Sequence, residues 1–295
     1  MQLTIGPILF YWHKEKVEAF YHSLSQLNLG SIYLGETVCA KRRELSLEDY
    51  ITLARTISQT SNAQIVLSSL ALLEANSELN SLKKLCSQTD FLIEANDMAA
   101  VHFCHEQQLP FIAGPALNIY NAYALAELIN CGMQRWVAPV ECSGLQIQQT
   151  LAQLDDLGIK RPEVEVFSYG HLPLAYSARC FTARAENRPK DQCKRCCIRY
   201  PEGIEVFSQE QQKLFALNGI QTLSGQVQNL ISDVAAMRQA GITHARLSPR
   251  AEGFIETIKQ WQAVLNGACA PLPTNDCNGY WHGKAGMFHL GDQHA

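Results

Sequence analysis

Residues 31–70, SIYLGETVCAKRRELSLEDYITLARTISQTSNAQIVLSSL, contain one complete β–α–β unit. Ser31–Gly35 and Gln64–Leu70 are apolar runs of strand length. Between them a helix is predicted to begin at Ser46, because Asp49 follows three residues later in a capping-box pattern. A helix that connects two strands favours parallel pairing, since the chain must cross back before the second strand begins.

The same alternation of strand and helix continues along the whole chain. Further strand-like runs are predicted at Leu3–Phe10, Phe91–Glu94, Phe111–Gly114, Arg135–Val140, Val164–Ser168 and Thr243–Leu247. Eight β–α units in a chain of this length predict an α/β fold, a closed (β/α)8 TIM-like barrel, with a doubly wound open sheet as the alternative. No Gly-x-Gly-x-x-Gly follows a strand, which argues against dinucleotide binding.

Composition is that of an ordinary globular protein. The chain has 295 residues, of which 47% are hydrophobic and 18% charged. We expect a single barrel domain over residues 1–295, with a cysteine-rich insertion at about 170–220 and a C-terminal tail at about 266–295. The formal net charge of −4 gives no overall basic field for nucleic acid. The start lacks the pattern of a signal peptide, which favours a cytoplasmic protein with reduced thiols.

The insertion that follows the seventh strand-like run is rich in cysteine and in basic residues. Residues 170–200 are polar and predicted to be irregular, with cysteines at Cys180, Cys193, Cys196 and Cys197. Thiols in a basic surrounding ionise readily, and thiolates that lie close together need a cation between them. The segment therefore predicts a metal or iron–sulfur site. A disulfide, a chance cluster of free thiols and a zinc site remain alternatives, although the second Cys-x2-Cys pair usual for zinc is missing.

A fifth cysteine, Cys39, follows the second strand-like run on the same predicted face as the insertion. Catalytic groups of a barrel lie where its strands end. Polar residues predicted to gather at that mouth are Glu36, Ser68, Asn96, Asp97, Asn118, Glu141, His171 and Arg246. Cys86, Cys104 and Cys131 lie in predicted helices, where a free cysteine packs as a small apolar residue. Cys142 is placed at a helix start, and Cys269 and Cys277 lie in the tail.

Several segments together resemble the collagenase-like peptidase family, in particular its branch that acts in oxygen-independent ubiquinone biosynthesis. The resemblance covers essentially the whole chain and is carried by Gly6–Trp12, Tyr33–Cys39, Ser168–Thr182, Leu217–Thr222 and Asp276–Trp281. The run over Ser168–Thr182 is the most specific of these.

The resemblance implies a [4Fe–4S] cluster on Cys39, Cys180, Cys193 and Cys197, and leaves Cys196 as a bystander. It also implies that the chain is an iron–sulfur subunit needed for O2-independent hydroxylation of the ubiquinone ring. The expected partner is a homologous, UbiU-like subunit in a heterodimer. A UbiT-like lipid-binding accessory protein and prephenate, as the oxygen donor, are further implied participants.

Two other functions compete with this expectation: a collagenase-like peptidase or hydrolase, and a non-catalytic scaffold with a structural metal site. The sequence does not favour a peptidase, because no nucleophile-elbow motif surrounds Ser177 and no His-Glu-x-x-His is present. Arginines near the cysteines, with Arg179 as the first choice and Arg42 and Arg43 as others, are expected to raise the reduction potential of a cluster.

Overall fold

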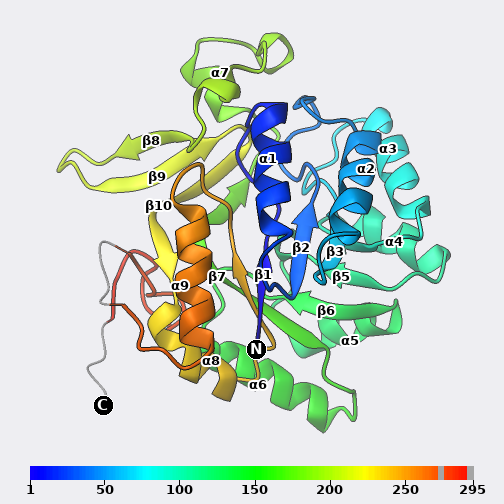
Figure 1. The fold of residues 1–295 in the computed structure, drawn as a ribbon, viewed down its shortest axis with the longest axis vertical. Helices are drawn as coiled ribbons and strands as arrows, with labels where there is room; N and C mark the ends of the chain where they lie inside the picture. Colours follow the sequence, from blue (N-terminus) through cyan, green and yellow to red (C-terminus); the bar gives the residue numbers. More distant parts are fainter. Residues whose placement is uncertain (272–275, 291–295) are drawn as a thin grey trace.

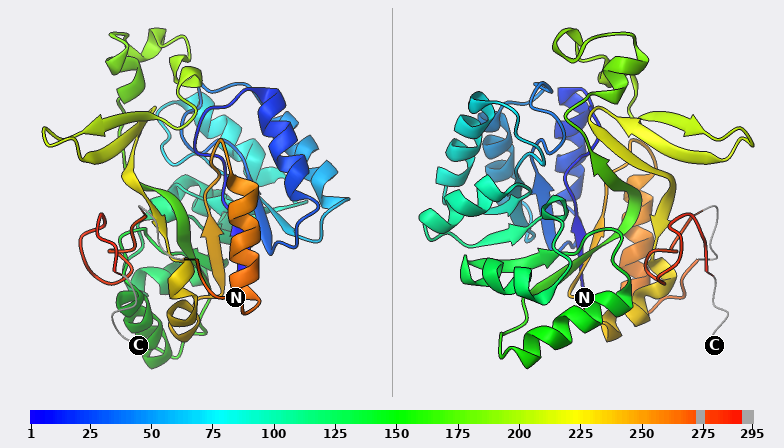
Figure 2. Two further views of the ribbon diagram at one scale, coloured as in Figure 1. Left: turned by 60° about the vertical axis from the view of Figure 1, so that its left-hand side comes forward. Right: turned by 180° about the vertical axis from the view of Figure 1, so that it is seen from behind.

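The computed structural model describes residues 1–271 and 276–290. In these ranges eleven strands form one sheet, and eight of them run parallel and close into a barrel (Figures 1 and 2). The barrel strands, in chain order, are β1 (Gln2–Ile5), β2 (Ser31–Leu34), β3 (Gln64–Ser68), β4 (Leu92–Ala95), β5 (Phe111–Ala113), β6 (Met133–Val137), β7 (Glu163–Tyr176) and β11 (His244–Leu247). β11 pairs with both β1 and β7 and so closes the ring. The predicted (β/α)8 TIM-like fold is confirmed.

Helices follow the barrel strands and pack around the outside of the ring (Figure 1). They are α1 (Lys14–Leu24), α2 (Leu47–Ser58), α3 (Asn76–Ser87), α4 (Met98–Glu106), α5 (Ala122–Asn130), α6 (Gly144–Asp156), α8 (Val234–Gln239) and α9 (Phe254–Leu265). The capping box of α2 forms as its sequence predicts. The hydroxyl of Ser46 accepts from the N–H of Asp49 at 3.1 Å, and the Asp49 carboxylate accepts from the N–H of Ser46 at 2.8 Å.

The insertion after β7 extends from the carboxyl end of the barrel, where Figure 1 shows it as a lobe with a protruding hairpin. It contains α7 (Phe181–Ala185), β8 (Ile204–Phe207), β9 (Lys213–Asn218) and β10 (Gln221–Asn229), and β10 pairs antiparallel with the second half of β7. Short 3-10 turns complete the description: η1 (Pro115–Leu117), η2 (Lys190–Gln192), η3 (Cys196–Arg199) and η4 (Ile231–Asp233).

The largest difference from prediction concerns β7 and β10. The seventh strand was expected to end at Ser168, but it continues to Tyr176 because its second half finds a partner in β10. The sequence pattern predicts a helix near Val227–Ala240, whereas β10 runs to Asn229 and α8 begins at Val234. The sequence also predicts a small hairpin from Glu205–Phe207 and Leu214–Leu217, and it forms as β8 and β9. The first strand ends at Ile5 rather than Phe10.

The tail after α9 returns to the barrel as far as it is described. The backbone N–H of Cys277 donates to the carbonyl of Val227 at 2.8 Å, and the carbonyl of Trp281 accepts from Gly144 at 3.0 Å. These bonds fix residues 277–281 between β10 and the first turn of α6. Residues 272–275 and 291–295 of the expected tail lie outside the described residues.

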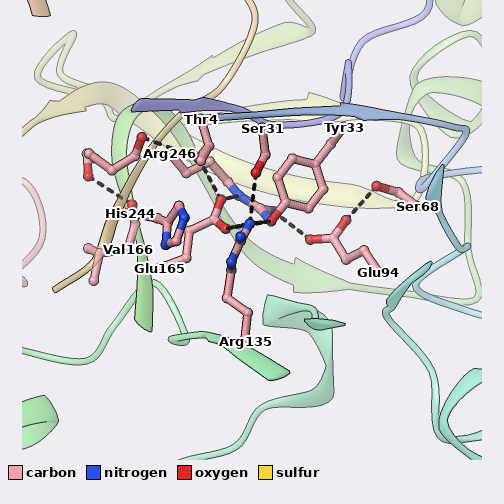
Figure 3. A network of polar contacts seen from close by, with 12 residues as sticks. Thr4, Ser31, Tyr33, Ser68, Glu94, Arg135, Glu165, Val166, His244 and Arg246 are labelled. Carbon is pink, nitrogen blue, oxygen red and sulfur yellow. Dashed lines mark hydrogen bonds and ion pairs between the residues drawn. The ribbon is translucent and has the colours of Figure 1, made fainter. Parts of the chain in front are cut away.

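Charged side chains, rather than only aliphatic ones, fill part of the barrel interior (Figure 3). Arg246 on β11 donates from Nε to Glu165 at 2.7 Å and from Nη1 to Glu94 at 2.7 Å. Arg135 contacts the other oxygen of Glu165 at 3.4 Å, and the hydroxyl of Tyr33 donates to that oxygen at 2.5 Å. All of these side chains are buried. Strands from opposite sides of the ring are thereby joined through its centre.

This network is sensitive to the loss of a single charge. Burial opposes ionisation of Glu165, but the charges of Arg246 and Arg135 outweigh it and lower the pKa of the carboxyl to about 2. Removing one member of a buried ion pair leaves its partner charged and unsolvated, which costs more than the pair itself contributes. Glu165 is therefore the carboxylate on which the two arginines depend.

We predict that Glu165→Gln lowers the free energy of unfolding by about 4 kcal/mol, because two buried guanidinium groups lose their shared counter-charge. Glu163→Gln is the matched control: Glu163 also pairs with Arg135, but its side chain is 51% exposed, so the loss should stay below about 1 kcal/mol. Urea unfolding of both variants measures the difference.

The stabilisation by Glu165 should be complete above the ordinary glutamate pKa of about 4.3 and fade as the pH falls toward 2. Equal losses in the two variants would contradict the prediction.

Candidate functional site

The loop after β2 and the insertion after β7 meet beside the carboxyl end of the barrel. The ammonium group of Lys41, two residues after Cys39, donates to Asp191 at 2.9 Å and to the carbonyl of Lys190 at 3.1 Å. This ion pair is exposed, with the Asp191 side chain 94% accessible, so it contributes little energy. It does place the segment of Cys39 next to the segment of Cys193.

Arg42 makes the stronger connection, because its guanidinium group is buried. Nη1 donates to the carbonyl of Leu9 at 2.7 Å, and Nη2 donates to the side-chain oxygen of Asn218 at 2.6 Å. Asn218 in turn donates to Leu9 at 2.7 Å, and a Glu36 oxygen lies 3.7 Å from Arg42. The side chain thus joins the loops after β1 and β2 to the turn between β9 and β10.

Gly219 in that turn has a backbone conformation that the approach of Arg42 requires. Its φ is +65°, and a Cβ built there would lie 3.2 Å from Nη2 of Arg42. A larger residue would meet both the strain of the left-handed region and a tight contact with the guanidinium. Two residues further on, Gln221 accepts from Asn218 at 3.0 Å, so the turn is fixed from both sides.

The four cysteines of the predicted cluster are half-buried free thiols. Burial raises the pKa of the Cys197 thiol to about 11 despite its hydrogen bond to Arg42. Burial also raises the pKa of Cys39, and the nearby Glu36 adds to that rise. Cys180 is close enough to both for its charge to affect them electrostatically. The structure therefore places Cys39 and Cys197 beside Arg42, with Cys180 near both of these thiols.

Cys193 lies at the edge of this group, in a turn with unusual backbone. Its charge acts on Lys41 and on Cys196. Its sulfur accepts from the N–H of Arg195 at 3.4 Å. Lys194 and Arg195 both have positive φ, at 48° and 54°, a conformation that costs non-glycine residues free energy. This turn directs the backbone N–H of Arg195 toward the sulfur.

The cysteine group fits some metals better than others. Among the described residues, no three His, Cys, Asp or Glu side chains are grouped as they would be around a single metal ion. A [4Fe–4S] cluster differs because each thiolate binds a separate iron atom, so its ligands surround a wider space. Arg42 Nε is buried without a hydrogen-bond partner in the described chain, as suits a donor facing an anionic group. The four thiols fit a cluster chemically; their ligand role stays a prediction.

The remaining cysteines lie apart from this group or serve packing. Cys196 is buried at 7% exposure. Cys86 on α3 and Cys104 on α4 are buried and share a hydrogen bond. Arg179, the first choice for tuning a cluster, is exposed, where solvent screens its charge. Arg42 is buried and contacts Cys197, so it is better placed than Arg179 to affect a cluster. Sequence spacing does not distinguish the two arginines.

The residues of the predicted polar mouth lie in different places and have different partners. Glu36 lies beside Arg42, while Ser68 and Asn96 donate to Glu94 in the barrel network with Arg246. Asp97 caps α4 by accepting from Ala99 at 2.7 Å. Asn118 and Glu141 line an open cleft of about 230 Å³. His171 lies within β7, and its Nδ1 donates to the carbonyl of Ser224 at 2.8 Å.

The chain matches the family model "Peptidase family U32" over residues 14–275. The chain belongs to this family. A solved structure titled "The crystal structure of AsfvAP:AG" is 9% identical, with 90% of this chain and 99% of that chain covered and a TM-score of 0.35. No helix in the described ranges is both long and apolar enough to cross a membrane.

The family name suggests a peptidase, but among the described hydrogen bonds none joins a serine hydroxyl to a histidine ring. Burial lowers the pKa of His171, and its bonded partner is a carbonyl rather than a hydroxyl. The hydroxyl of Ser177 instead accepts from the N–H of Arg179 at 3.2 Å. A nucleophilic serine needs a base within hydrogen-bond reach, and neither residue is arranged in that way here.

We predict that Arg42→Gln destabilises the protein by about 3 kcal/mol, because Leu9, Asn218 and Glu36 lose a buried partner. In a chain of this size the melting temperature should fall by roughly 6 °C. Arg43→Gln removes the same charge at an exposed position and should leave the melting temperature unchanged. Thermal unfolding of the two variants under anaerobic conditions gives the comparison. A similar shift for both would refute the role of Arg42.

Proposed function

We propose that this protein is a UbiV-like iron–sulfur subunit needed for O2-independent hydroxylation of the ubiquinone ring. Membership of family U32 supports the family part of the proposal. The placement of Cys39 and Cys197 beside the buried Arg42, with Cys180 near both thiols, is the observation that carries the rest. A buried arginine beside thiols favours a thiolate cluster of net negative charge.

A cluster held by four thiolates supplies one-electron transfer and offers no iron for direct substrate binding. The cysteines of this chain would hold it: Cys39 from the loop after β2, and Cys180, Cys193 and Cys197 from the insertion. Arg42 would hold the two segments in register through Leu9 and Asn218. Its positive charge would also favour the reduced, more negative state. At this edge of the barrel these residues would hold the cluster where a partner subunit could exchange electrons with it.

The ligand assignment is tested by single and double alanine variants purified without oxygen. We predict that replacing any two of Cys39, Cys180, Cys193 and Cys197 abolishes bound iron and acid-labile sulfide, because too few thiolates remain. Cys196→Ala is the matched control and should retain both. Iron and sulfide analysis with electron paramagnetic resonance measures the outcome. Loss in the Cys196 variant with retention in the Cys197 variant would overturn the assignment.

The same variants distinguish the proposed function from its two alternatives. A variant that folds and binds its partner but no longer supports hydroxylation indicates electron transfer. A variant that loses the cluster but keeps hydroxylation indicates a scaffold whose metal only stabilises the insertion. Hydrolysis of peptide substrates by the cluster-loaded wild type would support the peptidase alternative.

We further predict a stable heterodimer with a UbiU-like homologue, with prephenate as oxygen donor and a UbiT-like protein presenting the lipid intermediate. Co-expression of both chains and co-purification through a tag on one of them is the measurement. Size-exclusion chromatography should give a single species with the summed mass of the two chains. Two separate monomers, each folded and cluster-loaded, would count against the proposal.

A further inference from the structure

A small chamber lies at the carboxyl end of the barrel, and no cysteine lines it. Its volume is about 20 Å³, enough for one oxygen-sized group. It adjoins the cleft of about 230 Å³, and both are lined by Pro115, Pro173 and Tyr176. A narrow chamber that continues into a wider cleft suits a molecule with one polar end. The mouth of a TIM-like barrel is also where ligands bind in this fold.

Two residues that line the chamber each carry a polar atom with no hydrogen-bond partner in the described part of the chain. These atoms are Nη2 of Arg246 and the hydroxyl oxygen of Thr37. Both side chains are 3% exposed. The other two nitrogens of Arg246 are engaged by Glu165 and Glu94. A buried donor without a partner costs about 1–3 kcal/mol, so two such groups on one chamber indicate a bound oxygen.

The charge around the chamber decides which kind of oxygen fits. Arg246 and Arg135 carry two positive charges, and Glu94, Glu165 and the half-exposed Glu163 oppose them. Glu94 itself lines the chamber. Among these five groups no positive charge is left over to compensate an anion, since three carboxylates oppose two guanidinium groups. The free N–H of Arg246 can still donate to a neutral acceptor.

We propose that the barrel mouth binds a small neutral molecule whose carbonyl or hydroxyl oxygen enters the chamber and accepts a hydrogen bond from Arg246 Nη2. Thr37 contributes a second hydrogen bond, and the rest of the molecule occupies the cleft beside Tyr176 and Tyr120. The flat faces of these aromatic rings and of the prolines suit a planar ring. This site goes beyond the proposed cluster function, because none of its contacts requires bound iron.

The test compares benzamide and phenol with benzoate, which is nearly isosteric with benzamide but anionic. Binding to the anaerobically purified full-length protein is measured by ligand-observed NMR. We expect benzamide and phenol to bind, and benzoate to bind at least about tenfold more weakly, since an unpaired buried charge is strongly disfavoured. Benzoate binding as tight as benzamide, or no binding of any probe, would overturn the proposal.

Two variants locate the binding to the chamber and cleft. Thr37→Val removes a hydroxyl at constant shape and should weaken benzamide binding about fivefold, whereas Thr56→Val, on the exposed face of α2, should not. Ala116→Trp, in the cleft wall, should abolish binding. Unchanged affinity in both mouth variants, or a benzamide-soaked crystal with only water in the chamber, refutes the site. Iron and sulfide analysis of the same samples reports the cluster proposal separately, so either can fail alone.

Discussion

The ion pair between Arg246 and Glu165 is the interaction on which the barrel most depends. β11 must pair with β1 on one side and β7 on the other to close the ring. Arg246 comes from the closing strand and Glu165 from β7, and their atoms meet at 2.7 Å with no solvent between them. Because the second oxygen of Glu165 serves Arg135 and Tyr33, closure of the ring and neutralisation of its buried charges occur together. An open sheet would leave these charges without counterparts.

A second constraint follows from the length of β7. Its first half completes the parallel barrel, and its second half leaves the ring and pairs antiparallel with β10. One strand therefore carries the orientation of the barrel directly into the insertion. The turn after β9 then returns Asn218 to the barrel mouth, where Arg42 bonds it. The cysteine segment between α7 and η3 is supported by this frame on one side and by the loop after β2 on the other.

The sequence predicts most of the barrel because the barrel is built from local patterns. Apolar runs, the capping box at Ser46 and the alternation of strand and helix each act over a few residues. The extension of β7 was missed because it depends on pairing with residues at least 45 positions away, as the register of Tyr176 with Gln221 illustrates. A local signal for β10 existed in the sequence: Leu223 and Val227 lie four residues apart, each flanked on both sides by polar residues, as in a strand of period two.

The cysteines of the candidate site can be predicted from the sequence, but the role of its arginines cannot. The spacing of the cysteines and the family resemblance indicate which thiols belong together. Which arginine is buried depends on tertiary packing. Arg42 and Arg43 are adjacent in sequence, yet only Arg42 points into the protein to reach Leu9 and Asn218. Similarly, nothing in the sequence around Thr37 marks a ligand group. Its hydroxyl matters only because the chamber forms between it and Arg246.

The loop after β2 joins the two candidate sites physically. Thr37 lines the chamber and Cys39 lies among the thiols, with only Val38 between them. The N–H groups of Val38 and Cys39 both donate to Glu36, at 2.9 and 3.0 Å, and the carbonyl of Thr37 accepts from Ala71 at 2.9 Å. Such bonds restrict this short segment at every residue. A rearrangement at the thiols would therefore displace the wall of the chamber, whereas two sites on separate loops could respond independently. The short connection between Thr37 and Cys39 is a physical reason to place both sites in one reaction rather than in two unrelated functions.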